Sequence, residues 1–305
     1  MLNTIHLRTL LAVLRTGTFA DAARELNYTA SAVSQQIAAL ERTTGVELFE
    51  REAHGIRPTS FAYLLRDRSA PLVARLDELQ DEVSGLSSGR RGRLRLGSFP
   101  TASTWIVPEA LSDFLTKRPL TQVLLDEGEP EELLPALMDG VLDIALVYEY
   151  AMVPRAWPEG LSITEIRVED LILLLPAAHR RAGVRGLVLE DLSDDLWIAA
   201  KEGAAGSLSL QRLCASAGFS PHINFRSNNY DVIRGLVRAG LGVALVPALG
   251  YRPVAGVSAR LTRLRGAVRC VRALYRTKNA NPVLRDALDA LVAASAACVD
   301  LPPSP

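Results

Sequence analysis

The chain has 305 residues, and its 34 lysines and arginines balance 34 aspartates and glutamates, so its formal net charge is zero. A hydrophobic content of 49% with 22% charged residues is enough to build folded cores and excludes global disorder. No apolar run reaches the roughly 18 residues that a membrane span needs, and the N-terminus lacks the basic and then apolar pattern of a secretory signal. We therefore expect a cytoplasmic protein without a membrane partner, folded into two units or into one small and one large unit.

The residues that usually carry catalysis or hold metals are few and scattered. The three cysteines, Cys214, Cys270 and Cys298, lie far apart and form neither a disulfide framework nor a metal pair. None of the four histidines has a neighbour at metal-ligand spacing. Gly240-Leu241-Gly242 follows a helical pattern and precedes a strand, which is the reverse of a dinucleotide fingerprint. The sequence therefore predicts no cofactor, no metal and no catalytic residues, and hence no enzyme.

Residues 1–58 have the pattern of short helices followed by a hairpin. Leucines recur at helical spacing over residues 7–14, and Thr18 with Asp21 three positions later has the form of a capping box. Thr29 can cap a further helix that ends near residue 43, and residues 47–58 read as a hairpin. Two helices joined by a tight turn and followed by a hairpin predict a winged helix-turn-helix.

The helix that begins after Thr29 has one apolar side and one polar side. At about 100° per residue, Val33, Ile37 and Leu40 fall together, and we expect them to be buried. The small or uncharged residues expected to contact DNA, on the other side or at the helix start, are Thr29, Ala30, Ser31, Ser34 and Gln35. Glutamine can pair with adenine in the major groove, and a helix N-terminus favours a phosphate. A solvated surface helix is the alternative, but the order of helix, turn, helix and wing favours DNA binding.

Charge gives little help in this segment, because residues 1–58 hold six arginines and six acidic residues. Affinity for DNA would then depend on where the arginines lie. Arg51 and Arg57 flank the hairpin turn, so we expect them to contact phosphates or the minor groove. The alternative is that each is an ordinary surface arginine.

Residues 59–89 read as one long helix with an apolar seam. The seam residues follow a heptad spacing and are Leu65, Leu72, Leu76, Leu79, Val83 and Leu86. Pro71 interrupts the pattern, and we expect it to kink the helix or loosen a turn. The seam could pack on its own domain, but its place between a small and a large unit favours pairing with a second copy of the chain.

From residue 93 onward, predicted strands alternate with helices in two successive series. The predicted strands are residues 93–97, 121–126, 143–147, 171–175, 196–200, 222–226, 243–246 and 269–275. This alternation predicts parallel sheets covered on both faces and arranged as two similar lobes. We expect a two-lobed α/β domain over 90–305, with one lobe at about 93–165 and 269–300 and the other at about 166–268. Ligands of such folds lie at the carboxyl ends of strands and at helix N-termini. The polar residues of such loops, expected to contact a ligand, are Thr101, Ser103, Ser207, Asn228 and Asn229. Each could instead be only a helix cap.

Beyond these patterns, residues 5–59 resemble the DNA-binding domain of LysR-type transcriptional regulators almost without a gap. The segments that carry the resemblance are Ile5-His6-Leu7-Arg8, Gly17-Thr18-Phe19, Ala22-Ala23, Ser34-Gln35-Gln36-Ile37, Leu40-Glu41, Gly45, Leu48-Phe49, Arg51 and Pro58-Thr59. The chain departs from the family's usual pattern at two positions. Ala30 stands where the family usually has glutamine, and Ser31 stands where it often has proline. Ala30 removes one base-reading amide, so the family's usual half-site preference does not carry over.

The resemblance implies an α+β multidomain fold: a winged helix-turn-helix, a long linker helix that pairs two subunits, and a two-lobed effector domain like the type II periplasmic binding proteins. It also adds Glu129, in a loop that often touches the effector, to the candidate ligand residues. The implied partners are promoter or operator duplex DNA, a small-molecule effector, the chain itself as homodimer or homotetramer, and RNA polymerase. The alternatives are a cytoplasmic α/β enzyme or a solute-binding protein with an appended helical module.

Overall fold

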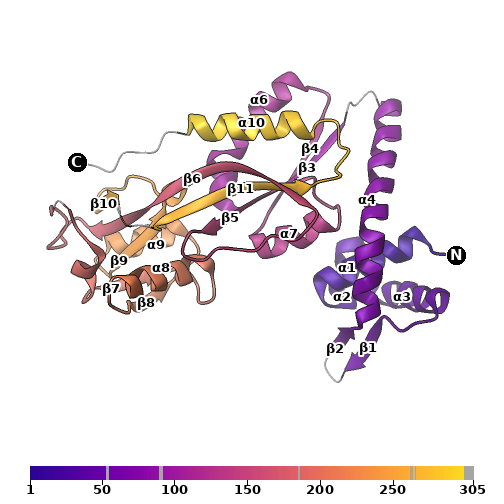
Figure 1. Ribbon diagram of the computed structural model, residues 1–305, viewed down its shortest axis with the longest axis horizontal. Helices are drawn as coiled ribbons and strands as arrows, with labels where there is room; N and C mark the ends of the chain where they lie inside the picture. The colour runs from indigo at the N-terminus through magenta and orange to yellow at the C-terminus, as the bar shows by residue number, and fades with distance from the viewer. Residues whose placement is uncertain (53–54, 89–91, 185, 262–263, 265, 299–305) are drawn as a thin grey trace. The chain divides into compact units, whose positions relative to one another are not determined.

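The computed structural model describes the chain except for residues 53–54, 89–91, 185, 262–263, 265 and 299–305 (Figure 1). The chain divides into two compact units. The first comprises Met1–Ser98, Leu115–Ala145 and Tyr275–Arg285, and the second comprises Phe99–Phe114, Leu146–Leu274 and Asp286–Pro305. Among the described residues, no helix combines the length and apolarity that crossing a bilayer requires.

The first unit begins with three helices whose ends are set by their capping residues. They are α1 (Thr4–Thr16), α2 (Phe19–Leu26) and α3 (Ala30–Thr44). The predicted caps are confirmed, because Thr18 Oγ1 accepts the Asp21 N–H at 3.0 Å and Thr29 Oγ1 accepts the Ala32 N–H at 3.2 Å. Gly45 ends α3 in the left-handed conformation, at a φ of 72°, which glycine adopts without a steric penalty.

The predicted wing follows α3 as a two-stranded antiparallel hairpin. Strand β1 (Phe49–Glu52) pairs with β2 (Gly55–Pro58). The start of the wing is tied to α3, because the Glu41 carboxylate accepts the Leu48 N–H at 2.8 Å and the Phe49 N–H at 3.3 Å. The Phe49 ring meets Phe19 of α2 edge-on at 5.7 Å. Helix-turn-helix and wing are therefore one packed body, as predicted.

One apolar core joins these elements. Its fully or almost fully buried residues include Leu10, Val33, Ile37, Leu40 and Leu48, each at most 2% exposed. The prediction that Val33, Ile37 and Leu40 form the inward side of α3 is confirmed. Burying a leucine or isoleucine side chain contributes about 1.5–3 kcal/mol, so this stripe fixes the rotation of α3 about its own axis.

Helix α4 (Ser60–Ser88) is a single long helix that packs on α1, and Figure 1 shows it running past α1, α2 and α3. It continues through Pro71, so the proline does not divide the predicted helix. Arg8 of α1 donates from Nη1 to Asp77 Oδ2 of α4 at 2.8 Å. Helix α4 is thus joined to the three-helix core by both apolar and charged contacts.

The rest of the first unit contains parallel strands and a helix. Strand β3 (Arg93–Ser98) lies parallel to β4 (Gln122–Glu127) and to the start of β5 (Ile144–Tyr150), and α7 spans Pro130–Met138. Asp143 precedes β5 and accepts the Arg95 N–H at 2.8 Å, while its own N–H donates to the Arg95 carbonyl. Burial raises the pKa of the Asp143 carboxyl.

The second unit contains most of the remaining sheet and its helices. Its elements are α5 (Pro100–Trp105), most of α6 (Val107–Lys117), β6 (Leu161–Pro176), η1 (Leu189–Leu192), β7 (Leu196–Ala199), α8 (Ala205–Ser216), β8 (His222–Arg226), α9 (Tyr230–Arg238), β9 (Val243–Pro247), η2 (Ala248–Gly250), β10 (Val257–Leu261), β11 (Val268–Arg276) and α10 (Leu284–Ala297). The alternating strands and helices predicted from the sequence are present.

The prediction of purely parallel sheets is wrong. Strand β7 is parallel to β8 and β9, but β6 is antiparallel to both β9 and β10. The first ten residues of β6 and all of β10 were not predicted as strands. Charged residues alternate with others along the first half of β6, so it lacks the continuous apolar run expected of a buried parallel strand.

We predict that Thr18→Ala loosens α2, because the substitution removes the acceptor for the Asp21 N–H. The expected loss is about 1 kcal/mol of local stability. Hydrogen exchange of the full-length protein, read on peptides from α2, should be about fivefold faster at this energy. Thr18→Ser keeps the hydroxyl and is the matched control. Equal exchange in the alanine and serine variants would contradict the capping role.

Candidate nucleic-acid interface and effector site

The outer side of α3 presents a polar surface to solvent. Thr29, Ala30, Ser31 and Gln35 are exposed and Ser34 is half-buried. Thr29 Oγ1 also lies 2.9 Å from Ser31 Oγ, so both hydroxyls sit at the start of the helix beside its first backbone N–H groups. Ser31 and Gln35 therefore lie opposite the buried stripe, Ser34 lies on its flank, and Thr29 and Ala30 lie at the start of the helix.

The two adjacent glutamines of α3 have different roles. Gln36 accepts a hydrogen bond from Thr9 of α1, and Thr9 is fully buried. This contact belongs to the packing of α1 against α3. Gln35 is exposed one position earlier, so its amide can reach a partner outside the chain.

Of the two wing arginines, the structure describes the side chain of Arg57 but not that of Arg51. Arg57 lies on β2, is exposed, and forms an ion pair with Glu50 on the opposite strand. A phosphate could replace this carboxylate, since exposed ion pairs contribute at most about 1 kcal/mol. Arg51 lies on β1, and its side chain lies outside the described residues.

The predicted seam of α4 has one residue packed on its own domain and three residues exposed to solvent. Leu65 is half-buried and packs against the core of the N-terminal helices. Leu72, Leu76 and Leu79 are 63%, 42% and 56% exposed. Val83 and Leu86 continue the spacing, but their side chains lie outside the described residues. Three leucines at heptad spacing on one helix thus remain exposed to solvent in the single chain.

In the second unit, Thr101 belongs to a buried polar group centred on Arg269. Arg269 donates from Nη2 to Thr101 Oγ1 at 2.9 Å and from Nε to Glu169 Oε1 at 2.6 Å. Glu169 Oε2 accepts the Leu249 N–H at 2.6 Å. Arg269 is 1% exposed and Glu169 is 2% exposed. Burial lowers the pKa of Arg269, but Glu169, Tyr230 and Tyr150 together raise it by more, so the guanidinium stays charged.

Aromatic rings enclose this group. The Arg269 guanidinium lies 5.1 Å from the Phe99 ring centre and 5.0 Å from that of Tyr148, which is cation–π geometry. Burial raises the pKa of Tyr150 and of Tyr230, so both phenols are neutral near pH 7. We call these seven residues the arginine cluster: Phe99, Thr101, Tyr148, Tyr150, Glu169, Tyr230 and Arg269. The cavity beside Tyr150 and Tyr230 holds only about 20 Å³, which is room for one water.

The other predicted ligand residues mostly serve local structure. Asn229 caps α9 by accepting the Asp231 N–H at 2.8 Å, and Asn228 Oδ1 accepts the Lys201 N–H at 3.0 Å. Ser207 Oγ accepts from Arg226 Nη1 at 2.9 Å. These contacts do not join the arginine cluster, although the Ser207 and Asn228 loops follow neighbouring strands.

The last two predicted ligand residues are Ser103 and Glu129, which lie in different units. Ser103 lies on α5 near Thr101, and its Oγ is buried with no hydrogen-bond partner among the described residues. Glu129 lies in the first unit, where it caps α7 in a capping box with Glu132.

Sequence reasoning missed Arg269, Glu169, Tyr150 and Tyr230. A signal was present, because Arg269 is the second residue of β11 and Glu169 stands in β6, two residues before the apolar run that begins at Leu171. A charge beside a buried strand needs a partner. Only the fold shows that these two charges are each other's partner, since they lie 100 residues apart in the sequence.

The fold and these sites define a winged helix-turn-helix regulator with a separate α/β domain, and comparison with known proteins gives the family. Residues 5–63 match the family "Bacterial regulatory helix-turn-helix protein, lysR family", and residues 87–296 match the "LysR substrate binding domain". The chain belongs to the LysR family of transcriptional regulators.

Relatives and solved structures agree with this membership. The chain is 30% identical over 268 residues to the "Probable hydrogen peroxide-inducible genes activator" of Mycobacterium leprae (strain TN), covering 87% of this chain and 83% of that protein. It is 30% identical over 252 residues to the regulator CbbR of Sinorhizobium medicae (strain WSM419), covering 80% and 76%. A full-length OxyR variant from Pseudomonas aeruginosa shares the fold, with a TM-score of 0.68 and 19% identity over 100% of this chain and 98% of that one.

We predict that Glu169→Gln destabilises the second unit, because it leaves the Arg269 charge buried without an anion. The expected loss is about 3–5 kcal/mol. All three tryptophans lie in this unit, so urea denaturation followed by tryptophan fluorescence reports on it. Adding Arg269→Met removes the orphaned charge and should restore much of the stability. A double variant no more stable than Glu169→Gln would contradict the assigned pairing.

Proposed function

We propose that this protein binds duplex promoter or operator DNA as a symmetric homo-oligomer and regulates transcription in response to a small-molecule effector. The observation that carries the proposal is the division of α3 into a buried apolar stripe and an exposed polar side next to the wing. Membership of the LysR family supports it, as does the solved structure of full-length CbnR complexed with its target DNA, which this chain resembles in fold with a TM-score of 0.59 and 22% identity over 96% of this chain and 100% of that one. Such a regulator works in the cytoplasm, where RNA polymerase is a further candidate partner.

In this proposal, α3 enters the major groove with its N-terminal half against the bases. The Gln35 amide pairs with an adenine edge, and Ser31 and Ser34 bond to bases or phosphates. Ala30 has no hydrogen-bonding group, but its methyl group can contact a thymine methyl. Thr29 and the first N–H groups of α3 approach a phosphate, which the helix dipole favours.

In this proposal, the wing positions the protein on the DNA backbone, and α4 relates two chains by two-fold symmetry. Arg57 exchanges its contact with Glu50 for a DNA phosphate, and Arg51 lies on the neighbouring strand of the wing. The exposed leucines of α4 pair with those of a second chain, since an apolar seam gains free energy when another helix removes it from water. A two-fold axis through this pair presents two copies of α3 to a roughly palindromic site.

The effector is proposed to act on the polar loops of the α/β domain. Thr101 and Ser103 are the best placed of the predicted residues, because Thr101 touches the arginine cluster and the Ser103 hydroxyl is buried. Ser207, Asn228, Asn229 and Glu129 remain predictions. Because the cavity beside the cluster is small, an effector there must move aromatic side chains, and so it selects a different arrangement of the domain.

Oxidation of Cys214 is a poor alternative to a bound effector, although some relatives are named as peroxide-inducible activators. Cys214 is buried, and burial raises the pKa of its thiol to about 12. The thiolate is the reactive form, so this thiol reacts slowly at neutral pH.

We predict that Gln35→Ala lowers affinity for the preferred DNA site by about tenfold to a hundredfold, as expected for the loss of a bidentate base contact worth about 1–3 kcal/mol. Affinity for unrelated DNA should stay the same, because the lost contact carries only sequence information. The preferred site is first found by footprinting genomic fragments with purified protein, and both affinities are then measured by fluorescence anisotropy at one salt concentration.

Thr43→Ala is the matched control, since Thr43 is exposed on α3 at the end of the helix far from its proposed base-reading half. It should leave both affinities near those of the unmodified protein. An unchanged ratio of specific to non-specific affinity in Gln35→Ala would refute the assignment of Gln35 as a base-reading residue.

A further inference from the structure

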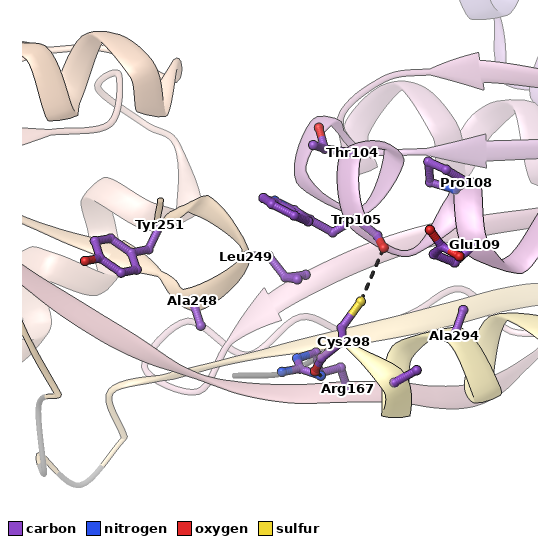
Figure 2. A pocket seen from close by; sticks show the side chains of 11 residues that line it. Thr104, Trp105, Pro108, Glu109, Arg167, Ala248, Leu249, Tyr251, Ala294 and Cys298 are labelled. Carbon is purple, nitrogen blue, oxygen red and sulfur yellow. Dashed lines mark hydrogen bonds between the residues drawn. The ribbon is translucent and has the colours of Figure 1, made fainter. Parts of the chain in front are cut away.

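A second and much larger cavity lies in the second unit, and no residue of the arginine cluster lines it (Figure 2). Its volume is about 680 Å³. Pockets that bind small molecules commonly measure about 300–1,000 Å³. Its walls come from α5 and α6, from β6, from η2 and the residue after it, and from the end of α10. We call it the Trp105 pocket.

Most of the wall is apolar and well ordered by packing. Figure 2 shows Trp105 of α5 and Leu249 of η2 extending toward the same space, with Tyr251 beyond them and Ala294 on the α10 side. Leu249 is 8% exposed and Tyr251 is 3% exposed, whereas the Trp105 indole is half-buried. The Trp105 indole and the Leu249 side chain favour a ligand with a flat or extended apolar body, while the Tyr251 ring packs in the neighbouring core.

A hydrogen-bond network fixes the elements that form the pocket. Arg167 of β6 donates from Nη1 to the carbonyls of Ser295 at 2.8 Å and Cys298 at 3.1 Å, which holds the end of α10. The Cys298 thiol donates to the Trp105 carbonyl at 3.2 Å (Figure 2). The pocket is thus formed before any ligand arrives, which lowers the entropic cost of binding.

The charges around the pocket select for the charge of a ligand. The Arg167 guanidinium stands in the wall, and Arg252 stacks on the Trp105 ring at 4.9 Å. Glu109 also lines the pocket and is exposed. Two cations near an apolar space attract one carboxylate, and the Glu109 carboxylate repels a second one.

We propose that the Trp105 pocket binds an amphipathic monocarboxylate, with its apolar body against Trp105 and Leu249 and its carboxylate toward Arg167. A ligand held there bridges α5, η2 and α10, and so it stabilises their present arrangement. The proposal concerns ligand binding alone and does not depend on DNA recognition.

The test is isothermal titration calorimetry of the full-length protein at pH 7 with three related probes: 2-naphthoate, neutral 2-naphthol and naphthalene-2,6-dicarboxylate. We expect saturable binding of 2-naphthoate with a stoichiometry of one per chain. It should bind about tenfold tighter than 2-naphthol, because a charge-assisted hydrogen bond to Arg167 is stronger than a neutral one. The dicarboxylate should bind more weakly than 2-naphthoate. Absence of saturable 2-naphthoate binding, or equal affinity for the acid and the alcohol, overturns the proposal.

Two variants place the probe in this pocket. Ala297→Trp narrows the pocket from its rim and should weaken 2-naphthoate binding at least about tenfold, by removing apolar contact area. The control Ala296→Trp adds the same side chain to an exposed neighbour outside the pocket and should bind normally. Arg167→Met should abolish the preference for acid over alcohol. Normal binding by Ala297→Trp, or equal weakening by Ala296→Trp, contradicts the site even if Arg167→Met fails to fold.

Discussion

The burial of Val33, Ile37 and Leu40 is the constraint on which the account of this protein depends. These side chains lock α3 against α1 and the wing, so the rotation of the helix is fixed before it meets DNA. Gln35 is then necessarily on the outside, while its neighbour Gln36 bonds to Thr9 within the core. In the proposed function, neutral hydroxyl and amide groups on such a face provide specificity, and the balanced charge of the domain leaves little sequence-independent attraction.

The contrast between a residue bonded inside the protein and a similar residue left exposed recurs along the chain. In α4, Leu65 packs against the core of its own domain, whereas Leu72, Leu76 and Leu79 are exposed to solvent in the single chain. In the second unit, Arg269 and Glu169 neutralise each other inside the protein, whereas Arg167 stands in the wall of an open pocket. Both arginines have partners within the chain, since Arg167 also donates to the carbonyls of Ser295 and Cys298. The described part of the domain therefore contains a closed polar centre and a preformed cavity.

The sequence predicts the parts of this structure that depend on local patterns. The caps at Thr18 and Thr29, the inward stripe of α3 and most strands follow from periodicity and capping chemistry, which act over a few residues. The arginine cluster and the Trp105 pocket could not be predicted, because their residues come from segments about twenty to more than a hundred positions apart. Strand β10 and the first half of β6 were missed for a related reason, since antiparallel pairing between them stabilises segments with weak strand patterns of their own.

The most direct test of the central claim is affinity cleavage of DNA from a fixed point on α3. Ser31→Cys, coupled to an iron chelate, leaves Gln35 intact, and the unmodified protein treated in the same way reports any cleavage from its own cysteines. The account predicts cuts at two positions related by a two-fold axis within one preferred site, because two copies of α3 lie in successive major grooves. Cuts that are identical without the new thiol, or spread evenly over unrelated fragments, would contradict it.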